Sequence, residues 1–190
     1  MKHLPIAFVA LAMLIACNNE KKTDDKMSGD NKDGKKESSS VTYPYTPRYS
    51  SQFSMGKDEN AQNLLMVWKA WDNNKLNDAK PYFADTVEMF LADNTHMKLP
   101  VDSFLAAGNS MRAAYPQLHS ELDAWLPLHA TEKNEDWVLI WGVEIRTDKN
   151  GVTDSSGLHE VWRVNKDGKF DQFFQYEQKL MPPPPAPKNK

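Results

Sequence analysis

The change of hydrophobic period after Pro116 constrains the fold of this chain more than any other feature. Before Pro116, apolar residues recur at the three- and four-residue spacing of a helix, as they do from Leu64 to Trp71. After it, apolar and polar residues alternate, as they do from Leu118 to His129, which is the period of a strand with one buried face. Helices gathered ahead of an antiparallel sheet predict an α+β domain.

The order of the elements follows from these periods and from the turns between them. Asn150-Gly151 and Asp167-Gly168 are strong hairpin signals. The strand before the first hairpin is expected to be central, because Val138 and Ile140 make its second face apolar as well. The predicted domain spans 58–180, with helices at 58–72, 76–83 and 102–115 and strands at 86–91, 118–129, 136–146, 158–165 and 170–180.

Residues 1–17 have the organisation of a secretory signal that ends at the single cysteine of the chain. A charged start precedes an apolar run from Leu4 to Ala16, which is too short to span a bilayer. Leu14-Ile15-Ala16-Cys17 resembles a lipobox, and this implies removal of a signal peptide, 1–16, and palmitate-type acylation of Cys17. We therefore expect a lipoprotein anchored in the cell envelope, on the periplasmic or the surface leaflet of an outer membrane. The alternatives are a plain signal peptide and an uncleaved anchor helix.

Segments with little to bury flank the predicted domain. Asn18 to Ser40 is polar and is expected to be a disordered tether. Within it, Lys22 to Lys26 resembles the acidic export signal of some Bacteroidetes surface lipoproteins, although a solubilising linker is the favoured interpretation. Aromatic residues beside prolines then predict an extended arm, so that 17–57 joins the anchor to the domain. The Pro-rich tail, 181–190, is expected to form polyproline II.

Several function classes find no support in the composition or the motifs. The net charge of -3 leaves no basic footprint for nucleic acid. The histidines lack the H-x-H and H-x-x-x-H spacings that place two metal ligands on one face, so no metal site is expected. No phosphate loop, G-x-G-x-x-G or G-x-S-x-G motif occurs, so no cofactor is expected.

Three short motifs resemble the nuclear transport factor 2-like superfamily, and in particular its SnoaL-like and ketosteroid isomerase-like branches. They are Lys69-Ala70-Trp71-Asp72-Asn73-Asn74-Lys75-Leu76, Tyr82-Phe83-Ala84-Asp85 and Val161-Trp162-Arg163-Val164-Asn165-Lys166-Asp167-Gly168-Lys169-Phe170. The first two resemble the helix-turn-helix that leads into the family's first strand, and the third resembles the hairpin into its last strand. The resemblance implies a cone, in which three N-terminal helices pack in a strongly curved, mixed and mainly antiparallel sheet.

A cone of this kind implies an apolar cavity at its open end. Aromatic residues at helical spacing usually fill a core, and this is the interpretation favoured for Trp68. For the other tryptophans near the cavity, lining and core packing are equally favoured. The residues predicted to bind a ligand are Val67, Trp71, Met89, Trp141, Glu160 and Trp162.

The resemblance to ketosteroid isomerase does not extend to its catalytic groups. That site needs a base carboxylate and two donors to an oxyanion. By resemblance, the tyrosine position falls on Val67, the base position on Met89 and the oxyanion aspartate on Glu160. Without a base, isomerisation of this type is not expected. Glu160 is either a buried acid in an apolar wall or, in the favoured interpretation, a carboxylate at the cavity mouth paired with Arg163, Arg146 or a lysine.

Three interpretations of function remain open. The preferred one is a lipid-anchored module that binds a small apolar ligand without catalysis. The second is a SnoaL-like isomerase, cyclase or hydrolase that uses Glu160 or His96, which lies in a predicted loop, as acid or base. The third is a structural module that forms a homodimer through the convex face of the sheet, with Val138 and Ile140 near the seam. A contact between Glu160 and His96 would favour the second, and a filled cone would favour the third.

Overall fold

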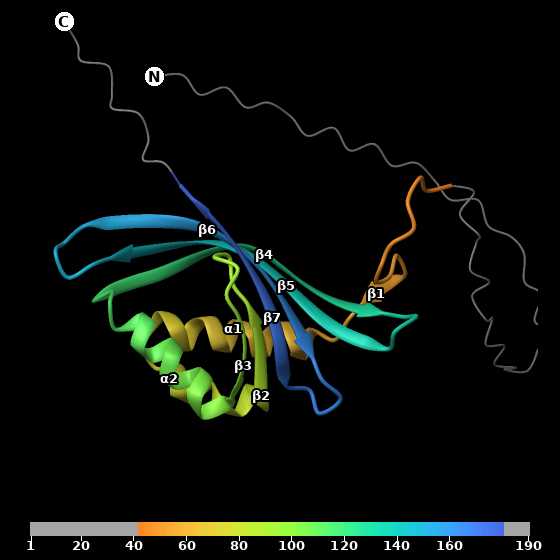
Figure 1. The fold of residues 1–190 in the computed structure, drawn as a ribbon, viewed down its shortest axis with the longest axis horizontal. Coiled ribbons are helices and arrows are strands. Elements are labelled where there is room, and N and C mark those ends of the chain that lie inside the picture. Colours follow the sequence, from red (N-terminus) through yellow and green to blue (C-terminus); the bar gives the residue numbers. More distant parts are fainter. Residues whose placement is uncertain (1–41, 181–190) are drawn as a thin grey trace, which may run out of the picture. The chain divides into compact units, whose positions relative to one another are not determined.

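A curled, open sheet of seven strands organises the computed structural model (Figure 1), which describes residues 42–180. The predicted signal peptide, the lipidation site Cys17, the polar tether and the Pro-rich tail lie outside the described residues. From Tyr45 onward the described residues belong to one unit. The elements are β1 (Phe53–Met55), α1 (Asp58–Asp72), the 3-10 helix η1 (Leu76–Tyr82), β2 (Phe83–Phe90), β3 (His96–Pro100), α2 (Val101–Arg112), β4 (Gln117–Ala130), β5 (Glu135–Thr147), β6 (Thr153–Val164) and β7 (Phe170–Lys179).

The strand order is β1-β4-β5-β6-β7-β2-β3. Every neighbouring pair is antiparallel except β2 and β7, which run parallel. The predicted α+β class and the mixed, mainly antiparallel sheet are therefore confirmed. Both Asn-Gly and Asp-Gly hairpins are present, and Gly151 and Gly168 take the positive φ that such turns require. The short strands β1 and β3 were not predicted.

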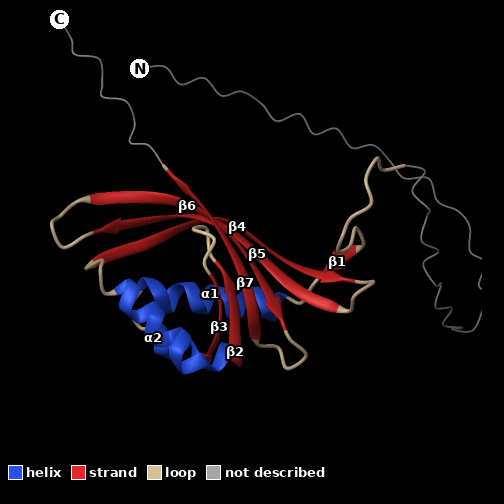
Figure 2. Cartoon of the chain, viewed as in Figure 1, coloured by secondary structure: helices blue, strands red, loops and turns tan. Residues whose placement is uncertain are grey.

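Helices α1 and α2 lie on the same face of the sheet, which is its concave face (Figure 2). The apolar stripe of α1 packs there, with Leu64 fully buried and Trp68 nearly so. The sheet meets this stripe with alternate residues of its strands, including Val138, Ile140 and Phe170, which are fully buried. This packing removes the apolar surface of both layers from water and is the main stabilising term of the domain.

The face assignment of β5 corrects one prediction. Val138 and Ile140 point into the concave core, so they cannot lie at a seam on the convex face. The convex face of β5 carries instead the half-buried residues Trp137, Leu139, Trp141, Val143 and Ile145. The residues on both faces of β5 are apolar, so their alternation in the sequence does not show which face the helices cover.

A bulge in β4 corrects a second prediction. The sequence predicts one continuous apolar face from Leu118 to Leu128, but Asp123 is an extra residue between the pairs Leu122–Gly142 and Ala124–Trp141. An inserted residue reverses the facing of every residue after it. Leu118 is therefore buried on the concave side, whereas Leu128 pairs with Trp137 on the convex side.

The segment before the domain contacts the sheet. The Tyr49 hydroxyl donates to Glu135 Oε2 at 2.6 Å and accepts from Trp137 Nε1 at 2.8 Å. A few residues later β1 pairs with the edge of β4, where Phe53 lies opposite Ala130. Within 42–180, no helix has the length and hydropathy needed to cross a membrane.

Candidate functional site

A cavity of about 230 Å³ lies between the helices and the concave face of the sheet. Every layer of the cone contributes to its wall. Its residues are Val67, Trp68, Trp71, Leu76, Phe83, Met89, Leu91, Met97, Phe104, Ala107, Gly108, Met111, Tyr115, Glu144, Arg146, Leu158, Glu160, Trp162, Phe173, Gln175 and Glu177.

Buried aromatic side chains form one end of this cavity. Trp162 stacks on Phe173 with ring centroids 4.2 Å apart, and Phe83 meets Phe104 edge to face at 5.0 Å. All four side chains are buried. The opposite end is more open, because Met111 at the end of α2 is exposed. The cavity is thus graded from an apolar floor to a polar mouth, which is how small-molecule sites orient a ligand.

Glu160 is the polar group in the middle of the wall, and only 6% of its surface is exposed. Its Oε2 accepts hydrogen bonds from the indoles of Trp68, at 3.1 Å, and Trp162, at 2.9 Å. Its Oε1 accepts one from the Gln175 amide at 2.9 Å. Burial raises the pKa of Glu160; the three N–H donors oppose this rise, and the nearby charge of Glu144 adds to it.

A second buried carboxylate, Glu144, lies closer to the mouth. Its Oε2 accepts a hydrogen bond from Trp71 Nε1 at 2.6 Å, and its Oε1 lies 3.3 Å from the guanidinium of Arg146. Burial raises the pKa of Glu144, the Trp71 and Arg146 contacts oppose this, and the charges of Glu177 and Asp72 add to it. Two carboxylates, each held by tryptophan N–H groups, therefore share one cavity.

Arg146 organises the mouth of the cavity. Its Nη2 donates to Ser156 Oγ and to Glu177 Oε1, both at 3.0 Å. The guanidinium also lies 5.3 Å from the ring centre of Tyr115, in a cation–π position. Within the described residues, Arg146 is the one basic side chain that lines the cavity. Its donors are already directed to protein carboxylates and a hydroxyl.

Most of the predicted ligand-binding residues line this cavity. Val67, Trp71, Met89, Glu160 and Trp162 all contribute to its wall. Trp141 does not, and this prediction is wrong. It lies on the convex face, where its ring stacks on His159 at 4.8 Å. The reason is again the facing of β5, because Trp141 alternates with Ile140.

The predictions for the two polar residues, Glu160 and His96, are corrected by their contacts. Glu160 is not a carboxylate paired with arginine or lysine; its partners are neutral donors, and Arg163 instead binds Asp171 at 2.8 Å. His96 is exposed at the start of β3, where it contacts Glu88 at 2.9 Å and stacks on Phe90. This is the convex side of the sheet, so the contact between Glu160 and His96 that would favour an enzyme is not formed.

Sequence reasoning named Arg146 only as a possible partner of Glu160 at the cavity mouth, and it missed Glu144 and Gln175 as cavity residues. A signal for Glu144 and Arg146 was present, because both continue the two-residue alternation of Val138 and Ile140 along β5. Once the concave face of this strand is known, their position follows. Gln175 follows in the same way, because it lies opposite Glu160 in the pairing of β6 with β7.

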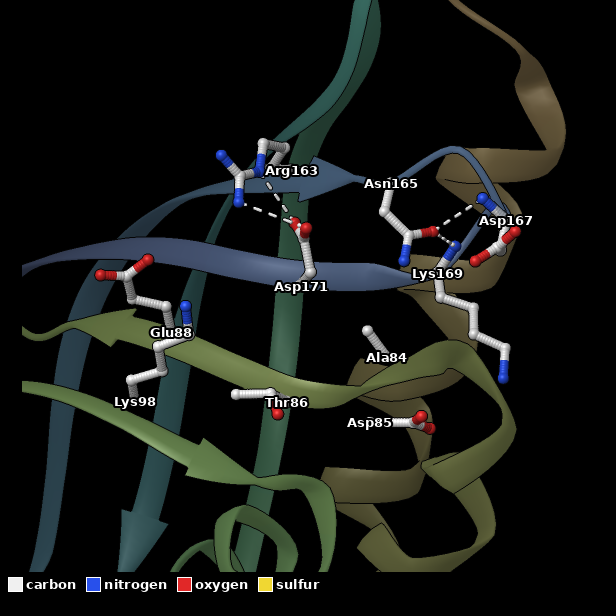
Figure 3. A pocket seen from close by; sticks show the side chains of 10 residues that line it. All are labelled: Ala84, Asp85, Thr86, Glu88, Lys98, Arg163, Asn165, Asp167, Lys169 and Asp171. Carbon is white, nitrogen blue, oxygen red and sulfur yellow. Dashed lines mark hydrogen bonds and ion pairs between the residues drawn. The ribbon is translucent and has the colours of Figure 1, made fainter.

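A second depression, of about 500 Å³, lies where β2 loses register with β7 (Figure 3). Its wall is polar and carries both signs of charge. Arg163 forms a two-point ion pair with Asp171, and the Asn165 side chain accepts hydrogen bonds from the turn that holds Asp167 and Lys169. Among the described residues, no cluster of histidine, aspartate or glutamate side chains could hold a metal ion. The depression lacks the apolar body of the concave cavity, which is therefore the candidate site.

Comparison with known proteins identifies the fold. No family model matches the sequence, and no curated protein matches it. A nuclear transport factor 2-like protein of unknown function from Exiguobacterium sp. 255-15 aligns over 61% of this chain and 98% of its own, with 13% identity and a TM-score of 0.51. A protein described as a SnoaL-like polyketide cyclase, from Jannaschia sp. CCS1, aligns over 66% and 89%, with 10% identity and a TM-score of 0.56.

An epoxide hydrolase from M. tuberculosis, described as LEH-like, also aligns, over 64% of this chain and 84% of its own, with 10% identity and a TM-score of 0.53. These structures share the cone and little sequence. The chain therefore has the nuclear transport factor 2-like fold, as its motifs predict. The fold hosts several chemistries, so function has to be argued from the side chains of the cavity.

Proposed function

We propose that this chain is a lipid-anchored domain of the cell envelope that binds a small, largely apolar ligand in its cone without catalysing a reaction on it. The observation that carries the proposal is the graded cavity itself. Its floor is built from buried aromatic and aliphatic side chains, and its polar groups gather toward the mouth. Apolar surface that a ligand buries against such a floor contributes roughly 25 cal/mol per Å².

The volume limits the ligand. At about 230 Å³ the cavity is smaller than the range of roughly 300–1,000 Å³ that is typical of sites for drug-sized molecules. It is larger than the cavity of roughly 150 Å³ that takes benzene in an engineered protein. A body of one or two rings, or an aliphatic chain of similar bulk, fits between these limits.

Absence of catalysis is proposed from the groups around Glu160. The positions that resemble the isomerase base and tyrosine hold Met89 and Val67, and both are buried and apolar. Trp68 and Trp162 occupy one oxygen of Glu160, and Gln175 occupies the other. The competing SnoaL-like enzyme would have to use Glu160 or Glu144, and tryptophan N–H groups already hold both carboxylates.

Two measurements test binding and catalysis separately. Native mass spectrometry of the full chain purified from its own host should show a retained small molecule. Incubation with 3-cyclohexenone, a small β,γ-unsaturated ketone, should give conjugated enone no faster than buffer does. Conversion well above the buffer rate that disappears in Glu160→Gln would replace the binding proposal with the enzyme.

The membrane anchor is proposed from the lipobox alone. Cys17→Ser should abolish incorporation of labelled palmitate and release the protein from the membrane fraction, because the thiol is the acceptor of a chain. Equal labelling and equal retention of the wild type and the variant would contradict the anchor. The cavity proposal does not depend on this result.

We also propose a homodimer through the convex face. Its interface would include the convex residues of β5 in place of Val138 and Ile140. The described helices leave this face uncovered (Figure 1), and its centre is apolar, with Leu139, Trp141 and Val143 on β5. Half-buried apolar side chains that gather on an uncovered face favour association, and an isologous contact would pair this face with itself. Light scattering of Val143→Glu should then give a lower mass than the wild type. An unchanged mass would contradict this seam.

A further inference from the structure

The charges in the cavity wall do not balance. Three carboxylates line it, from Glu144, Glu160 and Glu177, and they face the single guanidinium of Arg146. Arg146 contacts Glu144 and Glu177, whereas Glu160 has no ion-pair partner among residues 42–180. Any ligand that enters the cone therefore meets more acidic than basic groups, and a cation bound there would favour the ionised form of the carboxyls.

The rest of the wall is suited to a cation. Trp68, Trp71 and Trp162 direct their indole N–H groups to the two buried carboxylates. The N–H groups of these tryptophans are thus occupied, and their aromatic rings form part of the cavity wall. Aromatic ring faces attract ammonium groups, and the attraction grows when water is excluded. Carboxylates behind an aromatic wall add to this attraction.

We propose that the ligand of the cone carries a cationic amine on its small apolar body. This inference rests on the proposed binding function and narrows it to a chemical class. The apolar body packs against the floor that the stacked rings of Trp162 and Phe173 form, and the ammonium group lies on the polar side near Glu160 and Glu144. A buried cation is tolerated only where opposite charge compensates its lost hydration, and these two carboxylates supply that charge.

The same wall selects against anions. A ligand carboxylate would compete with Glu144 and Glu177 for Arg146, whose donors those two groups already hold. It would also lie near the carboxyl group of Glu160, which has no cationic partner to share with it. Repulsion of the wrong charge contributes to specificity as much as attraction of the right one. Glu177, whose side chain is 32% exposed, carries the negative charge out to the mouth.

A matched set of probes tests the class. Tryptamine, tryptophol and indole-3-acetate share one ring system and differ in the charge of the side chain. Isothermal titration of the full chain in nanodiscs, with empty nanodiscs as the blank, should give an affinity order of amine, alcohol, acid. Tryptamine should bind at least about tenfold more tightly than tryptophol, which corresponds to one desolvated cation–π contact of moderate strength.

Substitutions distinguish the effect of the cavity carboxylates on ligand affinity from the effect of the net charge of the protein. Glu160→Gln and Glu144→Gln should each remove most of the preference for tryptamine and leave tryptophol within about threefold of wild type. Glu121→Gln is the control, because it removes one charge from the exposed convex side of β4. If a buried variant fails to fold by circular dichroism, Glu177→Gln at the mouth serves the same purpose.

The possible outcomes distinguish the cationic class of the ligand from binding in the cone. Equal affinity for tryptamine and tryptophol would overturn the cationic class and leave cone binding intact. Tighter binding of indole-3-acetate than of tryptamine would also overturn the cationic class and leave cone binding intact. It would indicate that Arg146 binds the ligand. No binding of any probe at millimolar concentration would overturn both proposals. An equal loss in Glu121→Gln would show a general charge effect and would also overturn the class.

Discussion

The two faces of one sheet use aromatic side chains differently. On the concave face, Trp162 stacks on Phe173 and also donates a hydrogen bond to Glu160. On the convex face, Trp141 stacks on His159 at 4.8 Å and Phe90 stacks on Phe174 at 4.6 Å. The convex rings lie against one another across the strands, without a buried carboxylate among them.

The difference comes from the helices. Because α1 and α2 cover only the concave face, aromatic residues there lose contact with water and enclose a cavity whose polar groups must be satisfied from within. On the convex face the same residue types remain half-buried, and Tyr176 is 58% exposed. Position relative to the helices, more than residue type, therefore decides which tryptophans belong to the site.

The largest expected effect is the difference between Trp68→Ala and Trp141→Ala. Trp68 is 7% exposed and holds Glu160 with its indole N–H. Its truncation should lower the free energy of unfolding by about 3–5 kcal/mol. Trp141→Ala should cost clearly less, since that ring packs on an uncovered face. Urea unfolding of both variants measures the difference. Equal large losses would mean that the convex face is as tightly packed as the core.

The second expected effect compares two indole hydrogen bonds. Trp71→Phe keeps an aromatic side chain, although a smaller one, and removes the donor to Glu144, which is buried, so about 1–3 kcal/mol of stability should be lost through the hydrogen bond. Trp137→Phe is the convex counterpart. It removes a bond to Tyr49 in which both groups can be rehydrated, so the loss should stay near 0.5 kcal/mol, roughly the lower limit for one hydrogen bond. A larger loss for Trp137→Phe would reverse the comparison.

Much of the fold could be predicted from the sequence, because its signals are local. Helical stripes, alternation and the Asn-Gly and Asp-Gly turns each depend on a few neighbouring residues. The cavity residues Val67, Met89 and Trp162 could be located because the family resemblance fixed their elements. These three residues line one cavity because the cone-shaped fold brings their elements together.

What could not be predicted depends on contacts between distant strands. Alternation shows which residues of β5 share a face but not which face the helices cover, so Trp141 was assigned to the wrong side and Glu144 was missed. The extra residue Asp123 becomes visible only in the pairing of β4 with β5. His96 was assigned to a loop because the short strand β3, which places it on the convex side, has too few residues for a period.

A third prediction concerns pH. Burial raises the pKa of Glu160 in the folded protein. Between the ordinary carboxyl pKa and this raised value, the folded chain holds a proton that the unfolded chain has lost. Stability should therefore fall as pH rises through this window, and Glu144 acts in the same direction. In Glu160→Gln the fall should be shallower, as urea unfolding at a series of pH values would show.

The control for this series is Glu121→Gln, whose carboxylate is exposed on the convex side. Its stability should follow the wild-type curve at every pH. A Glu160→Gln curve parallel to that of the wild type would mean that Glu160 is not the group that couples folding to protons. Glu144→Gln would then be the next variant to compare.

The smallest effect on stability is expected for Tyr176→Ser on the convex face. Tyr176 is exposed, and its ring makes one tilted contact, with His159 at 5.9 Å, that leaves most of the tyrosine in water. Its removal should change the free energy of unfolding by no more than about 0.5 kcal/mol. If the convex face is a dimer seam, the same substitution should weaken the dimer, because an exposed tyrosine becomes an anchor once a partner covers it. Urea unfolding at low protein concentration, together with light scattering over a concentration series, separates the two effects. A loss above about 1 kcal/mol in the monomer would show that Tyr176 packs within the chain, and the contrast between the two faces would be smaller than we infer.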